Sequence, residues 1–362
     1  MKENKKKITW WQKLIIFVIV IALICVVFHF AFQYFSSVIC ENLESIAVSQ
    51  EYVDKGNEKI EIGSYYQDID ILFDESLILS QYAYEPEYDS TDRDEILTQY
   101  GFQNIQHFAN KPSQLYKHLS KKDNDASLMF SVVNSTVATK TMDDGNVLIA
   151  VAFKGTDSFN LSDDLSDMYK AVDKNGFHEG FMFNAQQFDK KADSIEININ
   201  GENIKLSQII GDMKNKDSKY KLLVTGHSLG AAVADIYSGY ILQNQGIDNS
   251  NLVTVTYGAP KSCSADYVYS GNNIINVINT DDMVPTIGAE EHLGTCLFYT
   301  PSEEFRKTNY KEHYVEPNIY NSYSDLLKTA ESSLVAHNLV MSYTPLIADI
   351  ESNHSHFFIY QD

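Results

Sequence analysis

The sequence predicts an α/β protein with a mostly parallel central sheet, helices on both faces of the sheet, and one N-terminal transmembrane helix before it. Two observations predict this architecture. The first is that short β-rich runs bounded by turn residues alternate with longer segments of helical pattern, and such alternation is typical of parallel strands joined by covering helices. The second is an uncharged apolar run, early in the chain, that is long enough to span a bilayer.

Charge and hydropathy divide the chain before residue 66 into three parts. Residues 1–13 carry five lysines and one glutamate, and we expect them to form a basic cytoplasmic tail. Residues 14–35 are the predicted signal anchor, because none of them carries a formal charge and the preceding lysines hold their end inside the cell. Residues 36–65 are largely polar and predict a stalk or linker before a globular domain at 66–362.

A cleavable signal peptide and a lipoprotein cysteine are the alternatives to this anchor. The apolar region of a signal peptide usually covers about 7–15 residues and ends at a small-x-small site, whereas this run is longer and is followed by poor sites. Cys40 follows the bulky Ile39, where a lipoprotein site has a small residue. The expected location is therefore the cell membrane, with a single pass, the N-terminus cytoplasmic and the globular domain extracellular.

The net charge of the chain is −21 at pH 7, and the rest of the chain is more acidic still, because its first residues are basic. A domain of this charge does not attract nucleic acid, and anionic lipid surfaces repel it. We therefore expect no nucleic-acid partner. The predicted membrane partner is reached through the N-terminal helix and not through surface charge.

Two of the four cysteines, Cys263 and Cys296, lie in the globular part. Cysteine spacing gives no zinc pattern. A disulfide between these two is permitted outside the cell, and a pair of free thiols, one or both of them buried, is an equally compatible interpretation.

The elements of the globular domain follow from the periodicity of apolar residues. A helical pattern starts near Ile69, and the β-rich runs come after it. The predicted strands span 126–137, 147–153, 221–225, 252–257, 274–279 and 295–300, and two further helices are predicted at 230–243 and 322–350.

Ser228 lies in the pattern Gly226-His227-Ser228-Leu229-Gly230, between a short apolar strand and a helix that opens with small residues. A nucleophilic serine on a strained strand-to-helix turn needs this context, because small neighbours let the helix and the strand approach closely. The pattern therefore predicts a nucleophile elbow and not an ordinary glycine-rich turn.

A serine hydroxyl is a weak nucleophile at neutral pH, so a histidine has to take its proton and a carboxylate has to orient that histidine. On a strand-turn-helix scaffold the acid and then the histidine follow the serine in the chain. The histidines that follow the candidate acids are His292, His313, His337, His354 and His356.

The chain resembles the fungal-type (class three) lipase family of the α/β-hydrolase superfamily in six ordered blocks, across roughly residues 70–350. One block is the elbow at 226–230. Two departures occur: Lys154 stands where the family usually has arginine, and Asp164 where it usually has tryptophan. The other five blocks are Val151–Thr156, Asp163–Asp167, Phe177–Phe181, Thr256–Lys261 and Asp281–Pro285.

The resemblance implies an α/β-hydrolase fold for residues 66–362 and assigns roles to individual residues. Ser228 would be the nucleophile and Asp282 the acid, with the neighbouring Asp281 as its alternative. His337 would be the base, and His356 is the alternative base, followed by His354.

The resemblance also implies an oxyanion hole formed by two main-chain N–H groups. Leu229 follows the nucleophile and supplies the first group, and Thr156 would supply the second, unless it simply ends a buried strand. His227 and His178 are interpreted as structural residues, as is Asp167, since His227 should point away from the serine hydroxyl and His178 precedes the serine in the chain.

These residues predict a membrane-anchored extracellular serine ester hydrolase that cleaves acylglycerol or related lipid carboxylic esters through an acyl-enzyme. A phospholipase A1, a thioesterase or an acyltransferase would use the same triad. A non-catalytic surface module on the hydrolase scaffold is an alternative from a different class. We expect no cofactor and no metal, since the sequence contains no phosphate-binding loop, metal-ligand cluster or dinucleotide motif. The segment 158–175, where the family carries its lid, is acidic and predicts a polar cover.

Overall fold

The structure is a computed structural model that describes residues 69–84, 90–108, 134–155, 172–267, 273–311, 334–353 and 357–360. The predicted tail, anchor and linker lie outside these ranges. Within the ranges, no helix has both the length and the apolar character needed to cross a bilayer.

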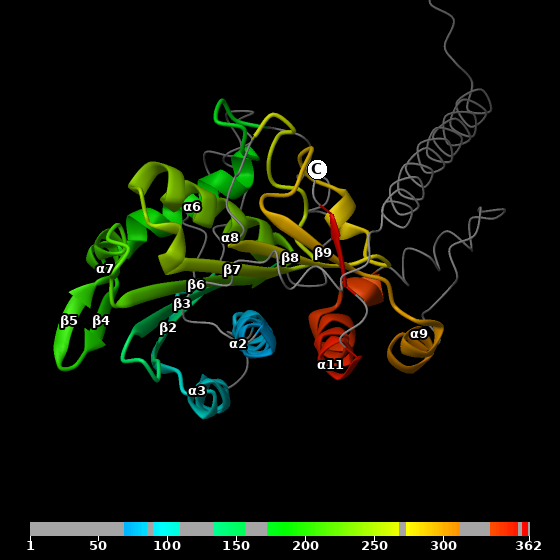
Figure 1. Cartoon of the computed structure of the whole chain (residues 1–362), viewed down its shortest axis with the longest axis horizontal. Coiled ribbons are helices and arrows are strands. Elements are labelled where there is room, and N and C mark those ends of the chain that lie inside the picture. Colours follow the sequence, from blue (N-terminus) through cyan, green and yellow to red (C-terminus); the bar gives the residue numbers. More distant parts are fainter. Residues whose placement is uncertain are drawn as a thin grey trace, which may run out of the picture.

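An eight-stranded sheet forms the centre of the molecule (Figure 1), in the order β1-β2-β3-β6-β7-β8-β9-β10. The neighbours β3, β6, β7, β8 and β9 run parallel, while β1, β2 and β10 pair antiparallel at the two ends. The prediction of a mostly parallel sheet is confirmed. The strands span Gln103–Phe108 (β1), Ser135–Thr141 (β2), Val147–Phe153 (β3), Tyr220–His227 (β6), Leu252–Tyr257 (β7), Ile274–Asn279 (β8), Thr295–Tyr299 (β9) and Phe357–Tyr360 (β10).

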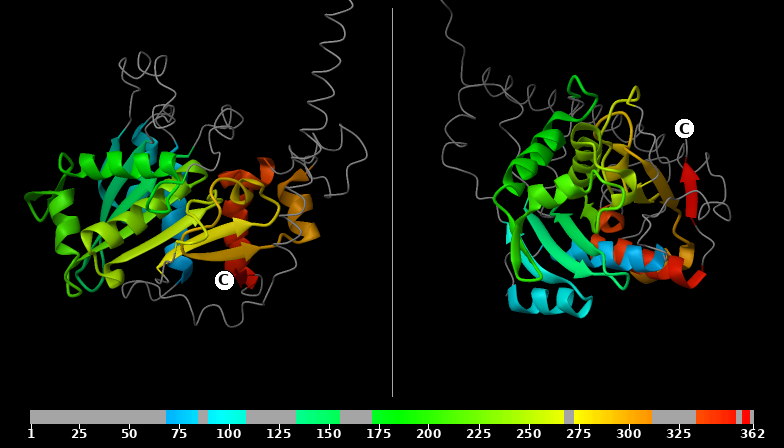
Figure 2. Two further views of the ribbon diagram at one scale, coloured as in Figure 1. Left: turned by 90° about the horizontal axis from the view of Figure 1, so that it is seen from above. Right: turned by 60° about the vertical axis from the view of Figure 1, so that its left-hand side comes forward.

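Helices cover both faces of the sheet, as Figures 1 and 2 show. The helices α6, α7 and α8 pack on one face, and α2, α3, α9 and α11 pack on the other. Their bounds are Ile69–Tyr82 (α2), Ser90–Gln99 (α3), Glu179–Ala192 (α6), Leu206–Asp212 (α7), Leu229–Tyr240 (α8), Glu303–Asn309 (α9) and Thr344–Asn353 (α11).

The alternation of side chains along β3 divides the core into two layers. Leu148 and Ala152 belong to the layer under α2 and α11, whereas Ile149 and Val151 belong to the layer under α6 and α8. All four side chains are fully buried, because helices cover both faces of this strand. A continuous apolar run such as 147–153 is therefore the expected sequence of a central parallel strand.

Helix α2 is tied to the sheet by buried hydroxyl groups as well as by apolar packing. The Ser80 hydroxyl lies 2.7 Å from that of Thr225 on β6, and the Ser76 hydroxyl lies 2.7 Å from that of Tyr257 at the end of β7. Hydroxyl groups in these buried positions need partners within the protein. In each pair, one hydroxyl group is the hydrogen-bond partner of the other. The two hydrogen bonds therefore fix the position of α2 over the sheet.

Several elements differ from the sequence-based expectations. The predicted strand 126–137 lies mostly outside the described residues, and the observed β2 runs later, over Ser135–Thr141. The hairpin of β4 (Glu196–Ile199) and β5 (Glu202–Lys205) was not predicted. The strands β1 and β10 were not predicted either. The sequence of β1 is largely polar, and both strands form by pairing with a neighbouring strand, β1 with β2 and β10 with β9. The predicted helix 322–350 is described from 334, where a helical turn and a π-helical turn at Leu339–Tyr343 precede α11.

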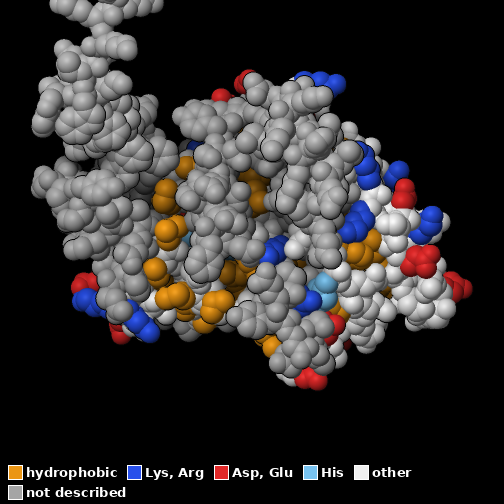
Figure 3. All heavy atoms as spheres, turned by 180° about the vertical axis from the view of Figure 1, so that it is seen from behind, with side chains coloured by type: hydrophobic (Ala, Val, Ile, Leu, Met, Phe, Trp, Pro, Cys, Tyr) orange, Lys and Arg blue, Asp and Glu red, His pale blue; other side chains and the backbone are white. Residues whose placement is uncertain are grey.

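Figure 3 shows charged side chains gathered at the end of the molecule that carries the β4–β5 hairpin, and hydrophobic ones nearer the middle of that face.

Cys263 and Cys296 are buried free thiols. Burial raises the pKa of Cys263 to about 12, so this thiol stays protonated and unreactive at neutral pH.

Candidate active site

Ser228 occupies a sharp turn between β6 and α8. Its backbone has φ 60° and ψ −131°, a positive-φ conformation that side-chain-bearing residues rarely adopt and that costs on the order of 1–3 kcal/mol. The turn is held by the Ser228 N–H, which donates to the Tyr257 carbonyl over 3.0 Å, and by the Ala231 N–H, which donates to the Ser228 carbonyl over 2.9 Å. Backbone strain of this kind at a non-glycine residue is common at functional sites. The conformation of Ser228 is the one expected for the turn of a nucleophile elbow.

The two glycines of the elbow are required by the close approach of backbones. A Cβ atom on Gly226 would lie 2.5 Å from the carbonyl of Gly230, and a Cβ on Gly230 would lie 2.2 Å from the Phe153 carbonyl oxygen. Both distances are far below van der Waals contact. The glycine spacing around Ser228 therefore allows α8 to start directly against β6 and the end of β3.

Three of the predicted site residues meet in one hydrogen-bonded chain. His337 Nε2 lies 2.8 Å from the Ser228 hydroxyl, and His337 Nδ1 lies 2.7 Å from Asp282 Oδ2. Ser228 and Asp282 are each 1% exposed and His337 is 5% exposed. The alternative histidines, His354 and His356, lie outside the described residues.

Asp282 is surrounded by donors, which keeps its carboxylate oriented toward His337. The Tyr343 hydroxyl donates to Oδ2 over 2.8 Å, and the Val284 main-chain N–H donates to Oδ1 over 2.9 Å. Burial and the charge of Asp282 raise the pKa of Tyr343 well above its usual value, so this hydroxyl stays a donor. The His337 Nδ1–H is the third donor to this side chain, and the three donors together fix the orientation of the Asp282 carboxyl group.

Asp281 has a different partner and does not hydrogen-bond to the histidine. Its carboxylate accepts two hydrogen bonds of 2.7 Å each from Arg306 on α9. Burial raises the pKa of Asp281, and Arg306 offsets only part of this effect. The pairing fixes Asp281 away from His337 and leaves Asp282 as the carboxylate at the histidine.

Asn279, the last residue of β8, links the loop that carries Asp282 to the segment that carries His337. It was not among the site residues predicted from the sequence. Its Nδ2 group donates to the Tyr310 hydroxyl over 2.6 Å and to the Ser342 hydroxyl over 2.8 Å. Its Oδ1 accepts from the Asp281 main-chain N–H over 3.0 Å. A buried amide at the end of a strand, just before the paired aspartates, was the available signal.

Gly258, just after β7, was also missed as a functional residue. Its φ is +60°, and a Cβ atom there would lie 2.9 Å from both Asp282 Oδ2 and the Tyr343 hydroxyl, and 3.2 Å from His337 Cε1. Only glycine combines this conformation with this lack of space. The signal in the sequence was a glycine that follows directly after a buried strand.

The predicted oxyanion donors are only partly described. Leu229 is the first residue of α8, where main-chain N–H groups have no partner within the helix. Thr156 lies outside the described residues, and its role stays a prediction. The residue before it, Gly155, lies against the elbow, because a Cβ atom there would come within 2.5 Å of the His227 carbonyl oxygen.

The histidines interpreted as structural do not hydrogen-bond to the serine hydroxyl in the described structure. The His178 ring stacks on Phe181 with ring centroids 4.1 Å apart. His227 contacts the main chain of His337 through Nε2, at 2.7 Å. Asp167 lies outside the described residues.

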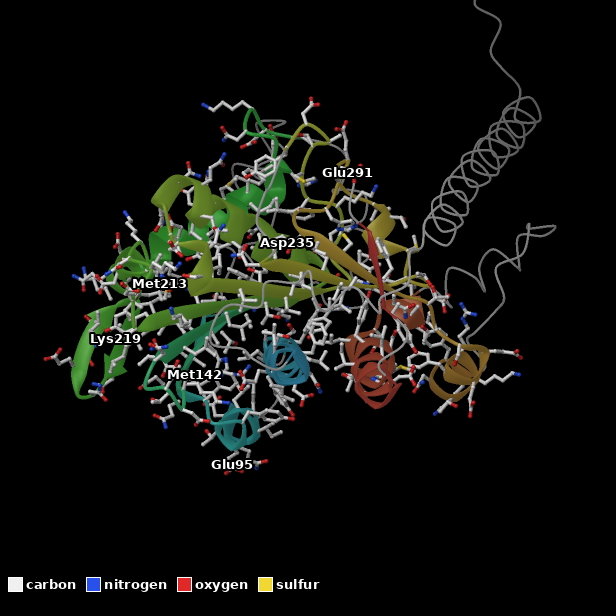
Figure 4. All side chains as sticks on the ribbon, in the orientation of Figure 1. Glu95, Met142, Met213, Lys219, Asp235 and Glu291 are labelled. Atoms are coloured by element: carbon white, nitrogen blue, oxygen red, sulfur yellow. The ribbon has the colours of Figure 1, made fainter. Side chains whose placement is uncertain are left out.

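A second buried aspartate, Asp235, lies in α8 on the other side of the sheet from α2 (Figure 4). It is 0% exposed. Burial raises its pKa well above the usual value, and the Thr256 hydroxyl offsets this only in part. Across the described ranges, no group of three or more histidine, cysteine, aspartate or glutamate side chains is arranged to hold a metal ion.

Residues 150–292 match the family model described as lipase (class 3). This part of the chain is therefore similar to class 3 lipases. The matched residues include Ser228 and Asp282, whereas His337 lies beyond them.

The curated proteins that this chain resembles include two plant proteins. Triacylglycerol lipase OBL1 of Arabidopsis thaliana is 24% identical over 349 residues, which cover 84% of this chain and 61% of the relative. Triacylglycerol lipase OBL1 of Ricinus communis is 31% identical over 110 residues, which cover 26% of this chain and 20% of the relative. The chain thus spans less than two thirds of the length of these relatives.

Among solved structures, a triacylglyceride lipase of Rhizomucor miehei is 19% identical with a TM-score of 0.42, covering 66% of this chain and 82% of that one. A lipase from Rhizopus microsporus var. chinensis is 16% identical with a TM-score of 0.44, covering 66% of this chain and 76% of that one.

Proposed function

We propose that the protein hydrolyses lipid carboxylic esters through an acyl-enzyme formed on Ser228. The observation that carries this proposal is the hydrogen-bonded chain from the Ser228 hydroxyl through His337 to Asp282. A serine, a histidine and a carboxylate in this order supply the nucleophile, the base and the group that orients the base.

In the first half of the reaction, Ser228 Oγ attacks the ester carbonyl carbon while His337 Nε2 takes the hydroxyl proton. Asp282 accepts from Nδ1–H and stabilises the imidazolium that forms. Negative charge develops on the carbonyl oxygen, and main-chain N–H groups positioned there lower the barrier. The Leu229 N–H, and the Thr156 N–H by resemblance to the family, would supply them.

Collapse of this intermediate breaks the bond between the carbonyl carbon and the alcohol oxygen, and His337 Nε2–H protonates the departing alcohol. In the second half, His337 removes a proton from water, the water oxygen attacks the acyl carbon, and the bond to Ser228 Oγ breaks. The carboxylic acid leaves and Ser228 recovers its proton. Each half therefore returns His337 to its neutral form.

The proposed substrates are acylglycerols or related neutral lipid esters. The curated relatives are named triacylglycerol lipases, and a chain with a net charge of −21 repels anionic substrates and favours uncharged ones. We also propose attachment to the cell membrane through residues 14–35, with the globular domain outside. The uncharged run and the lysines that precede it support this location.

Hydrolysis of p-nitrophenyl esters and of neutral and anionic lipid esters by wild type and Ser228→Ala tests the proposal. We expect ester hydrolysis in wild type and a loss of about 10⁴-fold or more in the variant, because the nucleophile is absent. Equal rates in the two proteins would contradict the proposed reaction, and a preference for anionic phospholipids would contradict the proposed substrate class.

A further inference from the structure

His227, the residue before Ser228, is buried and makes two hydrogen bonds, neither of them to the serine hydroxyl. Its Nδ1 lies 2.7 Å from the hydroxyl of Tyr84, and its Nε2 lies 2.7 Å from the main-chain carbonyl oxygen of His337. The proposed reaction uses neither contact directly. Each contact, however, connects the elbow to another segment of the site.

The chemistry of the partners fixes the protonation of this ring. A carbonyl oxygen only accepts, so Nε2 has to carry the hydrogen and donate it to His337. In a neutral imidazole the other nitrogen is then an acceptor, and the Tyr84 hydroxyl donates to it. Burial and the neighbouring His337 lower the pKa of His227 well below its usual value, in agreement with a neutral ring.

The position of Tyr84 is itself well determined. Tyr84 follows α2, which the pair Ser80 and Thr225 ties to β6. Its hydroxyl also lies where Gly155 has no side chain, since a Cβ atom there would come within 1.9 Å of it. The donor to His227 Nδ1 is thus placed by the scaffold, and it favours the tautomer that donates from Nε2.

The bond from Nε2 holds the main chain of the predicted base to the strand end that carries the predicted nucleophile. His227 and Ser228 are adjacent, and His337 is more than a hundred residues away in the chain. The rings of His227 and His337 also pack against each other, with centroids 4.6 Å apart. The bond therefore constrains the backbone from which the His337 ring reaches the serine hydroxyl.

The geometry points to His227 as a positioning residue, whose Nε2–H holds the His337 main chain so that the ring of His337 meets the Ser228 hydroxyl. This inference rests on the proposed function of the triad. His227 would act on the alignment of the base and not on substrate binding. A misplacement of about 1 Å in such an arrangement costs about 100-fold in rate.

The test compares three substitutions of His227 by kcat and KM on one soluble ester. Gln places an amide N–H near the position of Nε2 and can still donate to the His337 carbonyl, whereas Leu and the shorter Asn cannot. We expect His227→Leu and His227→Asn to lower kcat by about 10- to 100-fold with KM within about twofold. We expect His227→Gln to stay within about fivefold of wild type.

His178→Leu is the matched control, because it removes another buried imidazole, one that stacks on Phe181 instead of bonding to His337. Its kcat per folded molecule should stay near that of wild type, with folding followed by circular dichroism. If His227→Leu does not fold, the comparison of Asn with Gln decides in its place.

The inference is overturned if folded His227→Leu or His227→Asn keeps the wild-type kcat, or if His227→Gln loses as much as they do. Ser228→Ala in the same assay separates this result from a failure of the proposed function. If wild type shows no hydrolysis that depends on Ser228, the proposed function fails first.

Discussion

Asp282 and Asp235 are both buried aspartates, but they lie in opposite kinds of surroundings. Asp282, in the loop after β8, accepts hydrogen bonds from His337, Tyr343 and the Val284 main chain. Asp235 lies inside α8, where burial raises its pKa well above the usual value. The difference teaches that burial alone does not decide the role of a carboxyl group. Three donors orient the Asp282 side chain toward His337, whereas burial with few donors favours the neutral form of Asp235.

The largest expected effect contrasts the two aspartates directly. Asp282→Asn should lower kcat by about 10⁴-fold, because an amide no longer stabilises the imidazolium and favours the wrong histidine tautomer. Asp235→Asn should leave kcat within about twofold, since its side chain takes no part in the hydrogen-bonded chain. Steady-state hydrolysis of one soluble ester measures both. Similar losses in the two variants would remove the distinction between the two regions.

A smaller but still large effect is expected at Gly258, whose missing side chain leaves room for the Asp282 carboxylate. Gly258→Ala should lower kcat by about 100-fold, because the added Cβ displaces Asp282, Tyr343 or His337. Gly145→Ala is the matched control, since Gly145 also has a positive φ but no neighbour within 4 Å. Both variants carry backbone strain, so only a difference in kcat between them reports crowding of the site. Equal kcat values would contradict this account.

Removal of one donor from Asp282 sharpens the comparison further. Tyr343→Phe should lower kcat several-fold, because Asp282 loses the donor that holds its Oδ2 atom. The variant should also lose about 1.5–3 kcal/mol of the free energy of unfolding, which chemical denaturation measures. In Tyr237→Phe, the control, the lost hydroxyl has no hydrogen-bond partner among the described residues. This control should retain both kcat and stability. A Tyr343→Phe enzyme with wild-type kcat and stability would show that the donor is dispensable.

The smallest effect concerns stability and its pH dependence. Because the pKa of Asp235 is raised in the fold, the folded state binds this proton more tightly than the unfolded state. Its contribution to the free energy of unfolding is then greatest at acid pH and declines as pH rises through the unfolded and toward the folded pKa. Asp235→Asn removes this decline, so its Tm should exceed that of wild type at pH 7, with a smaller difference near pH 4. At this domain size, each 1 kcal/mol corresponds to about 2–4 °C.

Thermal unfolding across pH 4 to 8 tests the stability prediction. Asp212→Asn, at an exposed carboxyl at the end of α7, serves as the control and should track wild type at every pH. A Tm difference for Asp235→Asn that does not vary with pH would show that ionisation of this carboxyl is not its cause.

The parts of the fold that were predictable from the sequence are those in which local pattern and tertiary environment agree. Val147–Phe153 is apolar throughout and is buried on both faces, and the run ending at His227 continues into a glycine-flanked turn and a helix. Gln103–Phe108 carries no such pattern. It is a strand because its backbone pairs with β2, and pairing partners far along the chain leave little trace in a local sequence.

The same reasoning applies to the site. The strand-to-helix turn at Ser228 could be predicted because the elbow imposes a local glycine pattern. Asp282 and His337 were candidates from chain order together with the family resemblance, and their roles in catalysis stay a proposal. Asn279 and Gly258 were missed because their roles depend on residues that only the fold brings near them, such as Ser342 for the amide and Tyr343 for the glycine. The choice between Asp281 and Asp282 likewise depended on Arg306, which lies on a separate helix.

The reaction of the folded protein with a fluorophosphonate, followed by mass spectrometry, tests the central claim most directly. An activated serine attacks the phosphorus atom and displaces fluoride, and activation depends on the histidine. We predict a single adduct on Ser228 in wild type and labelling slower by about 100-fold or more in His337→Ala. No adduct on Ser228 in folded wild type, or equal labelling rates in the two proteins, would contradict the account.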